Sequence, residues 1–100
     1  MKFIISGKHL DLTEAIKNYA EEKLSKVEKY TEDINKMDVQ IEVEKTKTEG
    51  TLHKASATLY ILGKTIRIEE IDKDMYTAID LLADKLTRQV RKHLEKKQNK

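Results

Sequence analysis

The chain has 100 residues, the length of one ordinary domain, and apolar and charged residues each make up 38% of it. This composition excludes a disordered chain and indicates a thin-cored, well-solvated globular protein. There is no cysteine, so disulfides and thiolate metal sites are excluded. No stretch approaches the roughly 20 apolar residues of a membrane span. The apolar run at the N-terminus is too short for a signal peptide, so we expect a cytoplasmic protein that contacts no membrane.

The net charge of +2 conceals an uneven distribution along the chain. Residues 85–100 carry a net charge of +6, whereas residues 1–84 sum to −4. A mildly acidic body with a basic C-terminal segment indicates a polyanionic partner. Lys and Arg also complement the dipole at a helix C-terminus. Charge alone therefore leaves nucleic-acid binding and a plain solvated helix end equally open.

A strand and a helix are the first predicted elements. Residues 2–6 read as a strand that Gly7 ends. Asp11 or Thr13 can cap the helix that follows. Its apolar residues recur at helical spacing, which predicts a helix to about Tyr30. They are Leu12, Ile16, Tyr19, Ala20, Leu24 and Val27.

Three strands come next. Apolar and polar residues alternate strictly over residues 37–43, which predicts a strand with one buried and one polar face. A polar loop over residues 44–50 leads to a third strand over residues 54–61. Gly63 and Lys64 read as a tight hairpin turn, and residues 65–69 form the fourth strand.

The last predicted element is a long amphipathic helix, capped by Asp72 or Asp74. Its apolar stripe consists of Met75, Ala78, Ile79, Leu82, Leu86, Val90 and either His93 or Leu94. The order β-α-β-β-β-α predicts a two-layer α+β sandwich, in which two helices cover one face of a four-stranded sheet. A right-handed crossover should make the first two strands parallel.

No constellation of catalytic or metal-binding residues is evident. The three histidines His9, His53 and His93 fall in different predicted elements, and no phosphate-cradling glycine loop or nucleophile motif occurs. Asp80 and Asp84 lie one turn apart, and Asp72 and Asp74 lie just before the last helix. Capping, helix-dipole charge and i,i+4 contacts explain these four residues better than acid–base chemistry. We therefore expect no enzyme, no metal, no cofactor and no small-molecule substrate.

The last helix carries the candidate binding surface. A turn of roughly 100° per residue places Lys85, Arg88 and Lys92 in one row beside the apolar stripe. Lys96 joins this row if the helix persists, and Arg91 lies further round. Several rigidly spaced cations on one accessible line suit phosphate neutralisation, although many solvated helices also carry such residues. No carboxylate lies on the row after Asp84, which favours the binding interpretation modestly.

The first helix adds two cations, Lys23 beside its apolar stripe and Lys26 flanking it. If the helices pack side by side, these cations could extend the row. The outer face of the sheet is unsuited to RNA because it carries Asp38, Glu42 and Glu44. We therefore expect any RNA to bind on the helical side.

Long motifs in the last helix resemble the ribosome hibernation-promoting factor family. The family signature DMYxAID, DKLxRQ and KH is matched by residues 74–80, 84–89 and 92–93, and LTEAI at 12–16 and KLSKVEKY at 23–30 agree with it. The resemblance spans almost the whole chain. It implies a fold of β-α-β-β-β-α order related to double-stranded-RNA-binding domains, matching the order predicted above.

The resemblance also implies a bacterial protein that acts in stationary phase and starvation stress. Family members bind the small ribosomal subunit between head and body, overlap the sites of mRNA and tRNA, and block translation by occupancy. The implied contacts to rRNA are Lys23, Lys26, Lys85, Arg88, Arg91, Lys92 and His93.

The extent of the protein and two other functions stay open. Residues 1–100 read as one ribosome-binding domain, either a short-form factor or the N-terminal domain of a long one, with a monomer favoured. Whether ribosomes are inactivated singly or paired is also open. The alternative function is generic binding of double-stranded RNA, against which acidic residues at the start of the last helix argue. A third is a domain that docks on an acidic protein.

Overall fold

The computed structural model describes the backbone of residues 1–98 and the side chains of residues 1–95. The elements in chain order are β1 (Lys2–Lys8), α1 (Glu14–Leu24), the 3₁₀ helix η1 (Ser25–Lys29), β2 (Ile34–Thr46), β3 (Gly50–Ile61), β4 (Lys64–Asp72) and α2 (Met75–Gln98). This is the predicted order of strands and helices.

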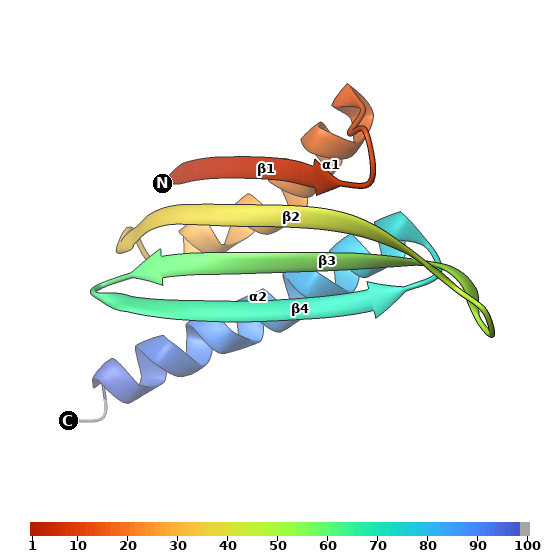
Figure 1. Ribbon diagram of the computed structural model, residues 1–100. Coiled ribbons are helices and arrows are strands. Elements are labelled where there is room, and N and C mark those ends of the chain that lie inside the picture. Colours follow the sequence, from red (N-terminus) through yellow and green to blue (C-terminus); the bar gives the residue numbers. More distant parts are fainter. Residues whose placement is uncertain (99–100) are drawn as a thin grey trace.

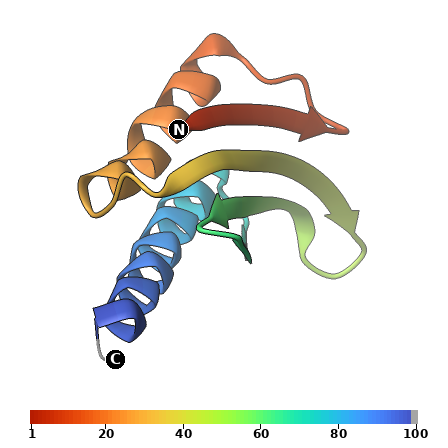
Figure 2. The same cartoon turned by 90° about the vertical axis from the view of Figure 1, so that its left-hand side faces the viewer.

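The four strands form one mixed sheet in the order β1-β2-β3-β4. Strand β1 pairs in parallel with β2, and the other pairs are antiparallel. Both helices lie on the same face, with α2 crossing it obliquely and its last turns extending past β4 (Figure 1). The side view shows the two layers and leaves the other face of the sheet uncovered (Figure 2). The predicted two-layer α+β sandwich is confirmed.

The core lies between these layers because each strand and helix has one apolar side. Apolar residues recur every second residue in the strands and every three to four residues in the helices. Every second residue of β2 and β3 points toward the helices, as the alternation of polar and apolar residues predicts. The buried residues come from α1, η1, β2, β3, β4 and α2. They include Ala20, Leu24, Val27, Met37, Val39, Ile41, Ala57, Leu59, Ile61, Ile79, Leu82, Leu86 and Val90. This packing fixes the surface that α2 shows to solvent.

Gly7 does not end the first strand, contrary to the prediction, because β1 continues to Lys8. A side chain at Gly7 would collide with the carbonyl oxygen of Leu10, so glycine serves here as a site of close backbone approach. The chain reverses afterwards at His9, whose φ of 59° is in the left-handed region.

The hairpins also differ from the prediction. The predicted polar loop over residues 44–50 is mostly strand, since β2 runs to Thr46 and β3 starts at Gly50. The second turn consists of Leu62 and Gly63 rather than Gly63 and Lys64. Leu62 has a φ of 44° and Gly63 a φ of 74°. Positive φ at both central residues is the twist that a two-residue hairpin requires.

Each helix begins at one of its two predicted caps. The Thr13 hydroxyl accepts a hydrogen bond from Ile16 N at 3.2 Å, and a carboxylate oxygen of Asp74 accepts from Thr77 N at 2.9 Å. The latter bond and one from the Thr77 hydroxyl lower the pKa of Asp74. The first α-helix ends at Leu24, earlier than predicted, and a tighter 3₁₀ turn continues to Lys29.

Candidate nucleic-acid interface

The predicted row of cations on α2 begins at Lys85, which contacts β4. An open hollow of about 500 Å³ runs along it, lined by Lys85, Arg88, Gln89, Arg91, Lys92 and Glu95. Gln89 and Glu95 were not predicted as part of this surface. Their position one turn from the row could have indicated it. The predicted contribution of Lys96 concerns a side chain outside the described residues.

Lys85 is less available than its position in the row suggests. Its ammonium lies 3.6 Å from a carboxylate oxygen of Glu70 and 3.4 Å from the carbonyl oxygen of Glu69, both in β4. These contacts join α2 to the edge strand. A phosphate at this position would have to displace or share them.

The cations from the N-terminal half lie on the opposite side of α2. Lys23 and Lys26 line a hollow of about 340 Å³, where α2 contributes Asp80, Ala83, Asp84 and Thr87. The helices therefore pack side by side, as the extended row required. Carboxylates nevertheless separate these two lysines from the cations beside β4.

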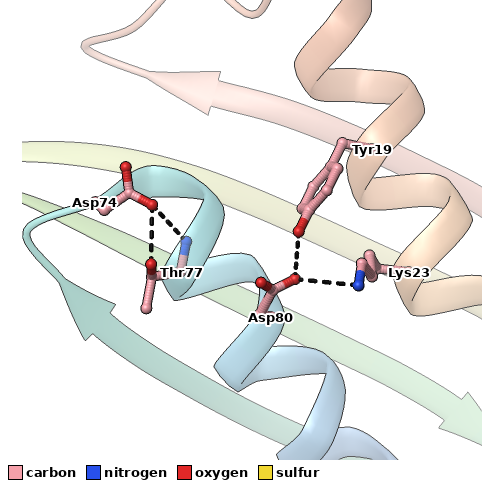
Figure 3. Close-up of polar contacts among 5 residues, drawn as sticks. All are labelled: Tyr19, Lys23, Asp74, Thr77 and Asp80. Carbon is pink, nitrogen blue, oxygen red and sulfur yellow. Dashed lines mark hydrogen bonds and ion pairs between the residues drawn. The ribbon is translucent and has the colours of Figure 1, made fainter.

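Asp80 fastens the two helices together (Figure 3). Its carboxylate accepts a hydrogen bond of 2.5 Å from the Tyr19 hydroxyl and lies 3.6 Å from the Lys23 ammonium. That ammonium is also 5.5 Å from the centre of the Tyr19 ring. The Tyr19 ring meets the Tyr76 ring edge to face at 4.8 Å. The i,i+4 explanation predicted for Asp80 is therefore wrong, because its partners belong to α1.

Substituting Asp80 by Ala is expected to lower the pKa of Tyr19. The hydrogen bond to Asp80, partial burial and neighbouring carboxylates raise this pKa to about 12, from 10.0 in an unfolded chain. Because the folded pKa is the higher one, this contribution to stability is complete below pH 10.0 and is lost toward pH 12. NMR titration of the Tyr19 ring measures the change. The Asp84→Ala variant should leave the pKa high; an unchanged pKa in Asp80→Ala would contradict the assignment.

Four predicted cations are exposed and unpaired. The side chains of Lys26, Arg88, Arg91 and Lys92 make no ion pair with any residue up to Glu95. They need no rearrangement to meet a polyanion. They are the strongest candidates in the predicted set.

His93 differs from these four residues. Its Nε2 atom is buried and has no hydrogen-bond partner within the described part of the chain. The ring therefore belongs to the packed flank of α2, and a contact with rRNA stays a prediction.

The uncovered face of the sheet has mixed charge. A hollow of about 210 Å³ is lined by Ser6, Asp38, Gln40, Ser56, Thr58 and Arg67. Tyr60 is exposed, and the Lys36 ammonium lies 5.4 Å from the centre of its ring. This face lacks the concentration of cations found on α2.

Within the described residues, no three His, Cys, Asp or Glu side chains are placed to hold a metal ion. None of the helices in this part of the chain is long and apolar enough to span a membrane.

Fold and surface together define a small α+β domain with an exposed cationic helix. The family model described as "Sigma 54 modulation protein / S30EA ribosomal protein" matches residues 3–98, so the chain belongs to this family. The family predicted from the motifs of α2 is therefore confirmed.

Curated relatives in this family carry a common name. The chain is 45% identical over 96 residues to "Ribosome hibernation promoting factor" of Azotobacter vinelandii, covering 96% of this chain and 85% of that one. A protein of the same name from Pseudomonas putida is 41% identical, with 99% and 92% covered. "Ribosome hibernation promotion factor" of Staphylococcus aureus is 39% identical over 93% of this chain, which matches only 48% of that protein.

Two solved structures share the fold. A "ribosomal subunit interface protein from Coxiella burnetii" superposes with a TM-score of 0.84 at 24% identity, covering 95% of this chain and 99% of that one. The "Thermus thermophilus Protein Y N-terminal domain" gives a TM-score of 0.72 at 29% identity, covering 93% and 99%.

Proposed function

We propose that this chain is a ribosome hibernation factor that binds the small ribosomal subunit and blocks translation by occupying the channel for mRNA and tRNA. The observation that carries the proposal is the set of four exposed cations beside and along α2 that form no ion pair within the described part of the chain, in a family whose relatives are named for ribosome hibernation. Ribosome association also makes this a cytoplasmic protein.

The four cations suit rRNA phosphates because a rigid scaffold holds them. Residues Arg88 and Lys92 lie one turn apart on α2, about 6 Å along its axis. The buried stripe of α2 fixes the direction in which they point. Arg88 and Arg91 can bind phosphate oxygens through two parallel hydrogen bonds, whereas Lys26 and Lys92 act as point charges. Such contacts position a protein on RNA without reading its sequence.

Lys23 and Lys85 have secondary roles in this proposal. Both are paired with carboxylates, Lys23 with Asp80 and Lys85 with Glu70. Each can contribute to the positive potential near the RNA without giving up its structural partner. If either lysine left its carboxylate to bind a phosphate, the gain in binding free energy would be smaller, because one ion pair would replace another.

The mechanism is steric rather than chemical. The folded domain fills a site that mRNA and tRNA need, and no bond is made or broken. Residues 1–100 act as one ribosome-binding domain, which we propose is monomeric by itself. Relatives of both lengths match this chain, which covers 85% and 92% of the A. vinelandii and P. putida proteins and 48% of the S. aureus protein.

Co-sedimentation with 30S subunits and 70S ribosomes at increasing salt tests the proposal. Binding should be stoichiometric, and the affinity should fall with salt. Four phosphate contacts predict a slope of about −3 to −4 in a plot of log K against log salt concentration. A plain RNA duplex is the comparison ligand. Tight duplex binding without binding to either particle would instead indicate a generic double-stranded-RNA-binding domain.

A further inference from the structure

The hollow between the two helices contains carboxylates as well as lysines, which pure phosphate binding does not explain. Lys26 lies on one side of it, and Ala83, Asp84 and Thr87 of α2 line the other. Asp84 and Thr87 also line an adjoining open hollow of about 410 Å³ together with Arg88. Asp84 therefore lies between two of the cations proposed to bind phosphate.

The fold accounts for Asp80 but not for Asp84. Asp80 holds Tyr19 and Lys23 of the neighbouring helix. The side chain of Asp84 is exposed and makes no hydrogen bond or ion pair with the described residues, although Arg88 is only one turn away. It also lies well beyond the first turn of α2, where the helix dipole would favour a negative charge.

An unpaired carboxylate in this position repels phosphate but suits the edge of a base. Carboxylate oxygens only accept hydrogen bonds, so they select the amino and imino groups of bases. Unstacked bases in single-stranded RNA expose these groups. Guanine presents an imino and an amino N–H side by side, which match the two oxygens of one carboxylate. The small side chain of Ala83 leaves space in the same hollow.

We propose that Asp84 reads an unstacked base of the bound rRNA, with guanine as the best fit, while Lys26 and Arg88 bind the neighbouring phosphates. This inference rests on the proposed ribosome binding. It assigns sequence selectivity to one carboxylate within an otherwise electrostatic interface.

The Asp84→Asn variant distinguishes base reading from repulsion by the sign of its effects. Removing the negative charge should strengthen binding to inorganic polyphosphate, which has no bases, by about two- to threefold. It should weaken binding to 30S subunits about tenfold, because an amide cannot accept both hydrogen bonds from guanine. Titrations of the full chain against the two ligands at the same salt concentration provide both numbers.

The control is Glu44→Gln, which removes one negative charge from an exposed position in β2. It should leave the affinity for 30S subunits nearly unchanged or raise it slightly. Asp84→Asn binding as tightly as the wild type, or more tightly, to both ligands overturns base reading while leaving ribosome binding intact. A wild-type chain that does not bind 30S subunits instead removes the proposed function, and this inference with it. Equal melting temperatures of all three proteins show that neither substitution acts through folding.

Discussion

Reversing the charges of Arg88 and Lys92 together, as R88E and K92E, is expected to weaken binding to 30S subunits at least about 100-fold. Each charge-assisted hydrogen bond contributes roughly 1.5–3 kcal/mol, so two lost contacts reach this factor without counting the new repulsion. Both side chains are exposed on α2 and pair with no described residue, so the fold should not change. Co-sedimentation measures the affinity, and circular dichroism measures the melting temperature.

The matched control for this double variant reverses Lys45 and Lys47 at the β2–β3 hairpin. Both residues are exposed and the change in net charge is the same. The hairpin projects from the opposite end of the sheet to the last turns of α2 (Figure 1). The affinity of this control variant for 30S subunits should fall only a few-fold. An equal loss in both double variants would show that net charge, and not the α2 surface, determines binding.

Lys85 is excluded from the double variant because of its partners. A glutamate there would face Glu70 in β4 and would repel it. The resulting loss of binding could come from a displaced helix. The sequence alone places Lys85, Arg88 and Lys92 in one equivalent row. The structure pairs Lys85 with Glu70, whereas Arg88 and Lys92 form no ion pair with the side chains described up to Glu95.

Replacing Leu82 by Ala should destabilise the domain by about 2–5 kcal/mol, since the side chain is fully buried between α2 and the sheet. A change of this size is a large part of the total stability of a small domain. It should lower the melting temperature by roughly 4–8 °C for each kcal/mol. Chemical denaturation measured by circular dichroism gives the free energy of unfolding.

The adjacent residue provides the control for this substitution. Leu81 is on the solvent side of α2 and is 39% exposed, so Leu81→Ala removes the same atoms without opening a core cavity. The free energy of unfolding of the Leu81→Ala variant should fall by less than about 1 kcal/mol, because the Leu81 side chain is only partly removed from water. Similar losses in the two variants would contradict the assignment of Leu82 to the core.

Much of the fold follows from short-range patterns in the sequence. The alternation from Met37 to Val43 and the apolar stripe from Met75 to Val90 identify a half-buried strand and an amphipathic helix. Such periodicity works because one side of each element must face the core. Element boundaries were less accurate. Strands gain length from pairing with partners, so β2 and β3 extend through residues that read as a polar loop.

The candidate interface could be predicted only as a list of cations. Their positions on each helix follow from the sequence, because a helix turns by a fixed angle per residue. Which of them are free depends on contacts between residues far apart in the chain. Asp80 meets Lys23 and Tyr19 of α1, and Glu70 meets Lys85 across the α2–β4 contact. No local pattern encodes these pairs.

The sequence by itself therefore determined the order of elements, the buried side of each helix and the family to which the chain belongs. Only the tertiary structure decided that Lys26, Arg88, Arg91 and Lys92 have no ion-pair partner among residues 1–95 and that Asp84 lies among them. The physical reason is how far apart along the chain the interacting residues lie. Periodicity and capping act within a few residues, whereas ion pairing and the shape of a hollow depend on how separate elements pack.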